Sequence, residues 1–406
     1  MKSLPKLFFA AVLTAAAVAG FASVPDASNG HFVVVNNSDI SGDNYGTVFK
    51  LGGNRSNPVL TQVASLNTES PSRGDGIVPS VQVARAGSDL CVFLAEPDSN
   101  LNNVITSFRY PNFTLVGNYS LTNLANGVIN IGLVASGGRL FASYNGYDNG
   151  YPATSYLASW TIGAGCTLTL VQTYPITAVS GVFSMAVSPN GKTLVASYEF
   201  DGTCCIGSFS IGADGSLTQH GPYYVFNAST IWGVDITADS KYAIFSIVGD
   251  CQPHPVCHAQ ININPINPDG SLGDGPTFGG DGSLGEAHAG GYVRLSPDER
   301  FLFATDDWQE VTTLNFTESP LNITFSGCLT ELKIPEGEPS VISQAIATAG
   351  RSGAGRAIYV AETASVALLA VNEKTGCTTE ASSSPFLIPD VNVNSASLVA
   401  WPPRGF

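Results

Sequence analysis

Positively charged residues are scarce in this chain of 406 residues, which has 17 Lys and Arg against 32 Asp and Glu and a net charge of −15. Non-specific binding to nucleic acid or to an anionic membrane needs a positive surface, so neither partner is expected. Long apolar runs are absent after residue 22, and no stretch keeps a helical period over three turns. The sequence therefore predicts a β-rich chain without a membrane span.

Several motifs that carry common chemistry are also missing. The chain has no Gly-x-Ser-x-Gly elbow, no phosphate-cradling glycine loop and no His-Glu-x-x-His pair. It has eight cysteines but no Cys-x-x-Cys spacing. These absences argue against a nucleophile-elbow hydrolase, a nucleotide-binding P-loop and a zinc site.

A phrase of two short apolar strands around a polar turn returns along the chain. Its clearest copies are Val187–Val195, Ile236–Ile244 and Leu295–Phe303, and weaker copies begin at Val83, Val134, Ile346 and Val399. The seven starting points are 49 to 59 residues apart. A fixed period of this length, filled with strands and turns, is typical of a β-propeller in which each repeat forms one blade.

The predicted fold class is all-β, a seven-bladed β-propeller with four antiparallel strands in each blade. The N-terminus supplies three strands, His31–Asn37, Tyr45–Leu51 and Pro58–Ser65, and the C-terminus supplies one, Ser395–Trp401. One strand plus three completes a blade and leaves no unpaired edge at the joint. Residues 23–406 are therefore expected to form a single domain, and the closed ring is expected to be a monomer.

Residues 1–22 have the features of a secretory signal peptide. Lys2 and Lys6 come before an apolar run from Leu7 to Ala19, and small residues follow this run. The pattern predicts cleavage between Ala19 and Ser23 and a location outside the cytoplasm, either extracellular or periplasmic. An oxidising compartment of that kind permits disulfides.

The cysteines suggest where such disulfides lie. Cys166, Cys328 and Cys377 each follow a glycine at matching places in three blades, which indicates bridges between neighbouring blades. Cys251 and Cys257 bracket a short loop and form the best local pair. The full connectivity does not follow from sequence.

Sequons of the form Asn-x-Ser/Thr occur seven times. A chain rich in Asn, Ser and Thr produces several by chance, so they do not distinguish a glycosylating host from a bacterial one. The asparagines are Asn36, Asn54, Asn112, Asn118, Asn227, Asn315 and Asn322.

Acidic residues recur just after the second strand of five predicted blades. In a propeller, the loops after second strands and the loops before innermost strands open on one face, at the mouth of the central channel, which is the default ligand site. Carboxylates that converge there could hold a hard cation such as Ca²⁺, or act as acid and base through a raised pKa. Alternatively they are solvated turn residues. The five are Glu96, Glu199, Asp250, Asp306 and Glu362.

The segment Gly285–Gly291 contains His288, the most informative of five histidines. It leads directly into the predicted innermost strand at Tyr292 and should therefore reach the mouth of the channel. Glu286, His288 and Arg294 could form a base, the group that orients it and an oxyanion partner. A histidine in a polar loop can equally be structural, so both interpretations stay open.

The phrases Ser296–Asp306, Ser188–Tyr198 and Asn267–Leu272 resemble those of the lactonase-type seven-bladed β-propellers. That group includes 6-phosphogluconolactonase-like proteins, carboxymuconate cyclase-like proteins and secreted YVTN-type propellers. The resemblance covers residues 31–402 and implies the propeller fold, with lactone chemistry as the activity. The histidine segment of such lactonases is matched here by Glu286-Ala-His288-Ala, with one histidine.

Two functions remain open on the sequence alone. The first is a secreted lactonase or cyclase-type enzyme that acts on a small molecule at the channel mouth, with a metal-dependent version that uses the acidic residues and Ca²⁺. The second is a non-catalytic secreted propeller that binds a ligand, a glycan or a partner protein. Propellers host both kinds, because fold does not determine function.

Overall fold

The computed structural model describes residues 31–39, 43–54, 57–71, 80–97, 103–120, 131–148, 151–176, 181–200, 203–226, 230–248, 259–279, 284, 291–305, 309–333, 345–348, 357–362, 365–388 and 393–402. The predicted signal peptide lies outside these residues, so its cleavage stays a prediction. Helical structure among them is limited to the three-residue turn η1 (Ala164–Cys166), and no helix in this part of the chain is long and apolar enough to cross a membrane.

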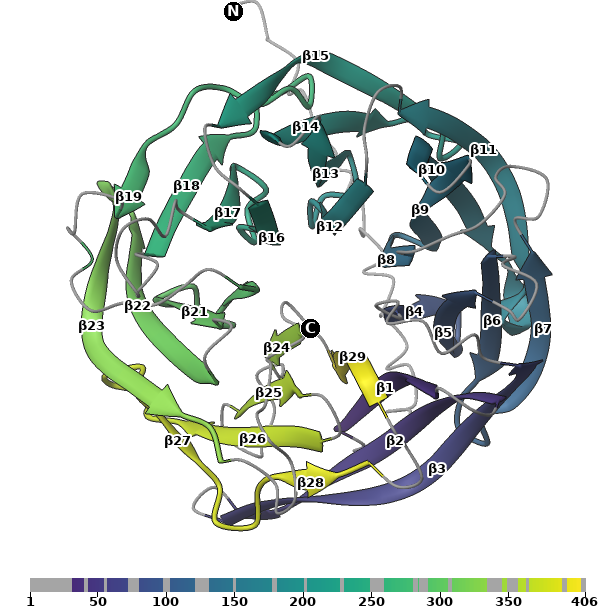
Figure 1. Cartoon of the computed structure of the whole chain (residues 1–406), viewed down its shortest axis with the longest axis horizontal. Coiled ribbons are helices and arrows are strands. Elements are labelled where there is room, and N and C mark those ends of the chain that lie inside the picture. The colour runs from purple at the N-terminus through teal and green to yellow at the C-terminus, as the bar shows by residue number, and fades with distance from the viewer. Residues whose placement is uncertain are drawn as a thin grey trace, which may run out of the picture. The chain divides into compact units, whose positions relative to one another are not determined.

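Seven antiparallel sheets surround a central axis (Figure 1). Blade 1 consists of β4 (Ser80–Ala86), β5 (Asp89–Pro97), β6 (Asn103–Arg109) and β7 (Thr114–Ser120). Blade 2 consists of β8 (Ile131–Ser136), β9 (Arg139–Asp148), β10 (Tyr151–Ile162) and β11 (Leu168–Ile176). Blade 3 consists of β12 (Gly181–Val187), β13 (Thr193–Phe200), β14 (Thr203–Ile211) and β15 (Leu217–Phe226).

The remaining blades follow the same plan. Blade 4 consists of β16 (Thr230–Ile236), β17 (Tyr242–Val248), β18 (Ala259–Pro265) and β19 (Thr277–Gly279). Blade 5 consists of β20 (Val293–Leu295), β21 (Phe301–Thr305), β22 (Glu310–Glu318) and β23 (Leu321–Glu331). Blade 6 consists of β24 (Ala345–Thr348), β25 (Ala357–Ala361), β26 (Ser365–Val371), β27 (Thr378–Glu380) and the short β28 (Phe386–Leu387). Blade 7 consists of β29 (Val393–Trp401), β1 (Phe32–Asp39), β2 (Asp43–Asn54) and β3 (Asn57–Pro71).

The innermost strands form a closed circle. β4, β8, β12, β16, β20, β24 and β29 each contact the next in this order, and β29 contacts β4 again (Figure 1). This arrangement confirms the seven-bladed, four-stranded propeller predicted from the repeat.

Blade 7 joins the two ends of the described chain. Strand β1 pairs antiparallel with β29, with Phe32 opposite Trp401 and Asn37 opposite Ala396, and β2 and β3 continue the sheet outward. The predicted closure by one C-terminal and three N-terminal strands is therefore confirmed. The joint leaves neither end strand as an unpaired inner edge.

The turn between the first and second strands explains the repeated sequence phrase. In blade 3 the Ser188 hydroxyl donates to the Asn190 side-chain oxygen (2.7 Å) and accepts from the Thr193 amide (2.9 Å). In blade 5 the Ser296 hydroxyl donates to Asp298 in the same way (2.8 Å). These side chains satisfy turn groups that have no ladder partner, so the phrase reports a structural requirement and not a catalytic site.

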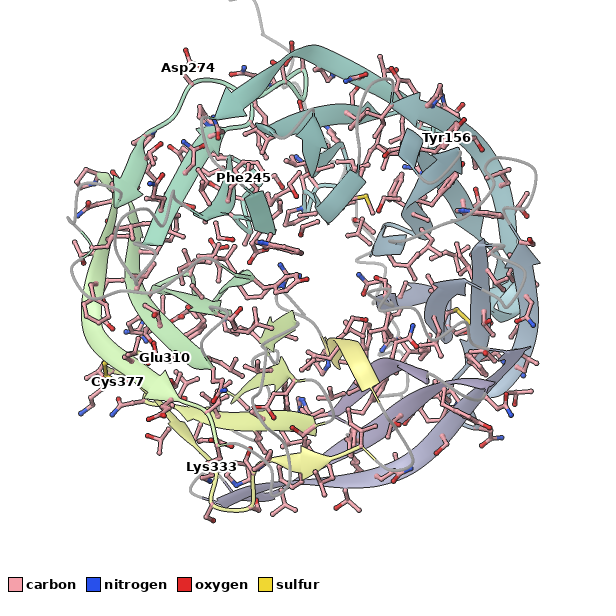
Figure 2. All side chains as sticks on the ribbon, viewed as in Figure 1. Tyr156, Phe245, Asp274, Glu310, Lys333 and Cys377 are labelled. Carbon is pink, nitrogen blue, oxygen red and sulfur yellow. A yellow bond between two sulfur atoms is a disulfide. The ribbon has the colours of Figure 1, made fainter. Side chains whose placement is uncertain are left out.

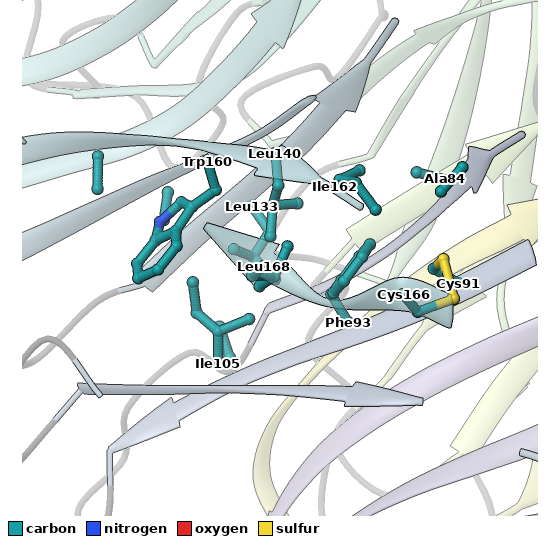
Figure 3. Packing of buried hydrophobic residues seen from close by; sticks show 14 of the residues in the cluster. Ala84, Cys91, Phe93, Ile105, Leu133, Leu140, Trp160, Ile162, Cys166 and Leu168 are labelled. Atoms are coloured by element: carbon teal, nitrogen blue, oxygen red, sulfur yellow. A yellow bond between two sulfur atoms is a disulfide. The ribbon is translucent and has the colours of Figure 1, made fainter. Parts of the chain in front are cut away.

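The hydrophobic core lies between neighbouring blades. Cys91 and Phe93 of β5 pack in one cluster with Leu140 of β9 and Trp160 of β10, and all four side chains are buried (Figure 3). Similar clusters occur at other blade boundaries, where apolar side chains alternate along paired strands. Each blade therefore depends on its neighbours for burial of its apolar side chains.

Two disulfides cross blade boundaries. Cys91 of β5 is bonded to Cys166 of η1, which joins blades 1 and 2 (Figure 3). Cys328 of β23 is bonded to Cys377, just before β27, which joins blades 5 and 6. The predicted bridges between neighbouring blades are therefore confirmed, whereas the predicted local pair of Cys251 and Cys257 lies outside the described residues.

Candidate functional site at the mouth end of the blades

Two kinds of segment meet at one end of each blade, which we call the mouth end. They are the segment before the innermost strand and the segment after the second strand. In blade 5, Val293 of β20 lies opposite Ala304 of β21, and Leu295 lies opposite Leu302. Because the strands are antiparallel, the chain enters β20 where β21 ends. The segment that contains His288 therefore leads into the mouth end.

A row of hydroxyl groups on second strands lies opposite the innermost strands or the residue just before them. Each hydroxyl accepts a hydrogen bond from a backbone N–H of its innermost strand or the residue before it, with N–O distances of 3.0 to 3.1 Å. The pairs are Ser143 with Gly132, Ser197 with Ser184, Ser246 with Gly233, and Thr305 with Tyr292. The sequence analysis did not predict this row. A signal for it was present, because in these four repeats a Ser or Thr lies nine or ten residues after the start of the repeated phrase.

The last residue of the histidine segment is held tightly in place. The Gly291 amide donates to the Thr305 carbonyl (2.8 Å), and the Ser246 hydroxyl of blade 4 donates to the Gly291 carbonyl. A Cβ on Gly233 would lie 2.6 Å from the Val293 amide nitrogen, so blades 4 and 5 approach backbone to backbone here. The segment that carries His288 therefore ends on a rigid support shared by two blades.

Arg294 and Asp235 connect the same two blades. The Asp235 carboxylate accepts from the Leu295 amide (2.8 Å) and from the Ile236 amide (2.9 Å). The Arg294 guanidinium donates from Nη1 to the carbonyl oxygens of Val234 (2.7 Å) and Val293 (3.0 Å). Strands β16 and β20 are thus joined by side-chain bonds to backbone, in addition to the packing of their apolar residues.

Charge is sparse along the innermost strands. Among their described side chains the charged ones are Arg85, Asp235 and Arg294, and all three are half-buried. The Arg85 guanidinium lies over the Trp401 ring, 5.5 Å from its centre. Nε and Nη2 of Arg294 make no hydrogen bond to another described residue. The Arg85 guanidinium makes no hydrogen bond to another described residue either, but Arg85 lies opposite Leu90 at the start of β5, away from the mouth end. Arg294 is therefore the described cation nearer the mouth end of an innermost strand that has donors left for an anionic or carbonyl group.

Glu362 is a buried carboxyl at the mouth end of blade 6. It directly follows β25, its side chain has no solvent exposure, and its Oε2 accepts a hydrogen bond from the Ser365 hydroxyl. Its Oε1 is buried without a hydrogen-bond partner among the described residues. Burial raises the pKa of Glu362 to about 7, the Ser365 hydrogen bond opposes this rise, and the charge of Glu380 adds to it. The group therefore changes its charge near neutral pH.

Replacing Glu362 with Gln is expected to remove a pH dependence of stability. The carboxyl has a pKa of 4.5 in the unfolded chain and about 7 in the folded one, so the unfolded state loses its proton first as pH rises. The stabilising contribution is present in full below pH 4.5, declines above it, and is lost once the pH passes about 7. The wild type should lose roughly 3 kcal/mol of unfolding free energy over this window that the variant retains.

Urea unfolding at several pH values between 4 and 8 measures this difference. A change at the exposed Glu373, to Gln, controls for the loss of one carboxyl group from the chain. Parallel curves for the wild type and Glu362→Gln would contradict the prediction.

The other predicted site residues fall largely outside the described part of the chain. Glu286, His288, Asp250 and Asp306 lie outside it entirely. Glu96 lies on β5 and Glu199 on β13, both near the mouth end, but their side chains are not among those described. Convergence of the acidic residues and assembly of the Glu286, His288 and Arg294 set remain predictions.

The Ca²⁺ prediction also stays open. Within the described ranges, no three His, Cys, Asp or Glu side chains come together as a metal-binding group. Glu362 is the one predicted metal ligand whose side chain is described, and a single carboxylate does not make a Ca²⁺ site, which needs six to eight oxygen ligands.

Comparison with known proteins identifies the fold. No family model matches the chain, and no curated protein matches its sequence. Among solved structures, the periplasmic gluconolactonase of Pseudomonas aeruginosa has a TM-score of 0.62 at 16% identity, over 92% of this chain and 100% of that one. A Bacteroides uniformis protein provisionally described as a 6-phosphogluconolactonase has a TM-score of 0.63 at 12% identity, with the same coverage. A Lactobacillus plantarum protein has a TM-score of 0.59 at 11% identity, over 91% and 99%.

These likenesses lie at identities of 16% or less, so they bear on the fold and not on the activity. The chain shares the β-propeller architecture of these solved structures, as the repeated sequence phrases predicted.

Proposed function

We propose that this chain is an exported lactonase-type enzyme that opens or forms a lactone at the mouth end of blades 4 and 5. The observation that carries the proposal is Arg294, a half-buried cation on an innermost strand whose Nε and Nη2 remain available beside the end of the histidine segment. The likeness in fold to a periplasmic gluconolactonase supports the same substrate class.

The proposed chemistry assigns one role to each residue. His288 takes a proton from water as the water oxygen attacks the lactone carbonyl carbon, and Glu286 orients the imidazole. Arg294 donates hydrogen bonds to the carbonyl oxygen as it becomes negatively charged. The ring C–O bond then breaks, His288 returns the proton to the leaving oxygen, and a hydroxy acid forms. The reverse sequence closes the lactone.

Export is part of the proposal. The N-terminal segment has the pattern of a signal peptide, and two disulfides lie between blades, which fits an oxidising compartment. With 17 Lys and Arg in the chain, a neutral lactone fits the site better than a phosphorylated sugar.

A lactone screen tests the enzyme. The mature protein, starting at Ser23, is incubated with sugar, aliphatic and aryl lactones, and acid release is followed by titration, with Ca²⁺ or with a chelator. His288→Ala is expected to lower kcat/KM by at least about 100-fold, as expected for loss of a general base. His220→Ala, on the outer strand β15, is the matched control and should retain activity.

Each other outcome has a defined meaning. Activity that survives His288→Ala but requires Ca²⁺ would contradict the histidine mechanism and favour the acidic residues. A well-folded protein without turnover of any lactone would overturn the enzyme proposal and favour a propeller that binds a ligand, a glycan or a partner protein.

A further inference from the structure

Five of the seven sequons have an asparagine side chain that the structure describes, and these five differ in exposure; the side chains of Asn54 and Asn227 are not among those described. The Asn36 side chain is fully buried, and its Nδ2 donates to the Ser80 carbonyl (2.8 Å) across the boundary between blades 7 and 1. Because the side chain is fully buried, a glycan on this nitrogen has no space, so the folded protein must carry Asn36 unmodified.

Two more acceptor nitrogens take part in hydrogen bonds. Asn118 of β7 donates from Nδ2 to the Thr68 carbonyl of β3 (3.1 Å), which links the outer strands of blades 1 and 7. Asn315 of β22 is half-buried and donates to the Thr324 hydroxyl (3.3 Å). A glycosylated asparagine keeps one N–H on this nitrogen and can still donate one hydrogen bond, and the Asn118 side chain is exposed. These two contacts therefore do not decide whether either asparagine carries a glycan.

Asn112 and Asn322 are different. Both side chains are exposed, and neither takes part in a side-chain hydrogen bond with another described residue. Asn112 lies in the turn between β6 and β7, and Asn322 lies at the start of β23. The residue after Asn322, Ile323, is buried, so the asparagine side chain points to the opposite, solvent-facing side of the strand.

These two asparagines share one end of the propeller. The Tyr110 amide, just before Asn112, donates to the Leu90 carbonyl at the start of β5 (2.9 Å). In blade 5 the residue after Asn322, Ile323, lies opposite Phe316 of β22. The Phe316 amide in turn donates to the Arg300 carbonyl, just before β21 (2.9 Å). Second strands start at the end opposite the mouth, so both sequons lie away from the candidate site.

We propose that the exported, folded protein carries N-linked glycans at Asn112 and Asn322, and none at Asn36. In this modification the asparagine nitrogen attacks the anomeric carbon of an oligosaccharide attached to a lipid diphosphate. A C–N bond forms, the bond from the anomeric carbon to the phosphate oxygen breaks, the lipid diphosphate leaves, and the amide gives up one proton. The inference rests on the proposed export but not on the lactonase activity.

The proposed glycans would make the two faces of the propeller different, one carrying sugar and the other free of it. Glycans at Asn112 and Asn322 cover the face opposite the mouth in blades 1 and 5, while the mouth end of these blades stays open to a ligand. Bulky sugar on a surface turn adds solubility without touching the blade cores.

Site-specific mass spectrometry tests the inference. The full chain is secreted from a eukaryotic host, once with its own N-terminal segment and once with the leader of the host, and is treated with peptide N-glycosidase in ¹⁸O-labelled water. Asn112 and Asn322 are expected to become labelled Asp, and Asn36 is expected to remain Asn. Thr114→Ala should abolish the label at Asn112, whereas Thr114→Ser should keep it.

The outcomes separate the inference from its premises. Secreted protein that is unlabelled at Asn112 and Asn322, or labelled at Asn36, would overturn the inference. Secretion with the host leader alone would count against the proposed export, while the labelling still decides the glycan sites. Glycosylated protein without lactone turnover would overturn the proposed activity and leave this inference standing.

Discussion

A chain that ends after Ile388, and so lacks β29, is expected to yield no stable propeller. β29 is the innermost strand of blade 7, pairs with β1 along its length and contacts β4 and β24 on either side. Its Leu398 and Trp401 side chains are buried, and their exposure alone would cost about 3 to 6 kcal/mol. Loss of a whole inner strand therefore removes an amount comparable to the total stability of a domain, and it also opens the ring.

Circular dichroism with heating, size-exclusion chromatography and limited proteolysis would together show whether the shortened chain still folds into a stable propeller. The expected result is a chain that aggregates or is cleaved throughout, without a cooperative melting transition. A matched truncation after Pro402 keeps β29 and should melt as the full chain does. A β29-deleted chain that melts at the temperature of the full chain would refute the closure argument.

Removal of the Cys91–Cys166 disulfide is expected to cause the second-largest loss of stability. The bond closes a sequence separation of 75 residues, for which restriction of the unfolded chain contributes about 4 kcal/mol. Both sulfur atoms also lie in the cluster with Phe93 and Leu140, so Cys91→Ala with Cys166→Ala leaves unfilled space in the core (Figure 3). The double variant should therefore unfold at a clearly lower urea concentration than the wild type.

The second disulfide supplies the control. Cys328 and Cys377 close a separation of 49 residues, so the unfolded-chain contribution is again about 4 kcal/mol. Both residues are only half-buried, however: Cys328 lies on the outermost strand β23, and Cys377 lies at the periphery of the ring (Figure 2). Their paired replacement by Ala should cost less than loss of the buried bond, because little core packing is lost. An equal or greater cost at the peripheral bond would contradict the packing argument.

The propeller was predictable because its determinants are local and repeated. The turn side chains of Ser188 and Asn190 are satisfied within six residues of sequence, so the same phrase marks each blade that uses it. Counting strands at the two ends then predicted the closure of blade 7. Neither step needs knowledge of contacts between distant residues.

The candidate site was predictable only in outline. The position of Arg294 on an innermost strand followed from the repeat, but its bond to the Val234 carbonyl depends on how closely blades 4 and 5 approach. In two of the four blades with the hydroxyl row, the innermost strand has a register shift close to the bonded residue, as between Val182 and Ser184. A shift of this kind leaves no simple mark in the alternation of apolar and polar residues.

The sequence by itself determined the number of blades, the way the ring closes and the placement of cysteines at blade boundaries, because these follow from strand periodicity and from turns that satisfy their own backbone groups. The tertiary structure alone decided that Cys91 is the partner of Cys166, that Glu362 is buried with a pKa of about 7, and that Asn36 is buried while Asn112 is exposed. Disulfide pairing, pKa and exposure all depend on neighbours brought together from other blades, and burial by such neighbours is a property of packing that no local pattern encodes.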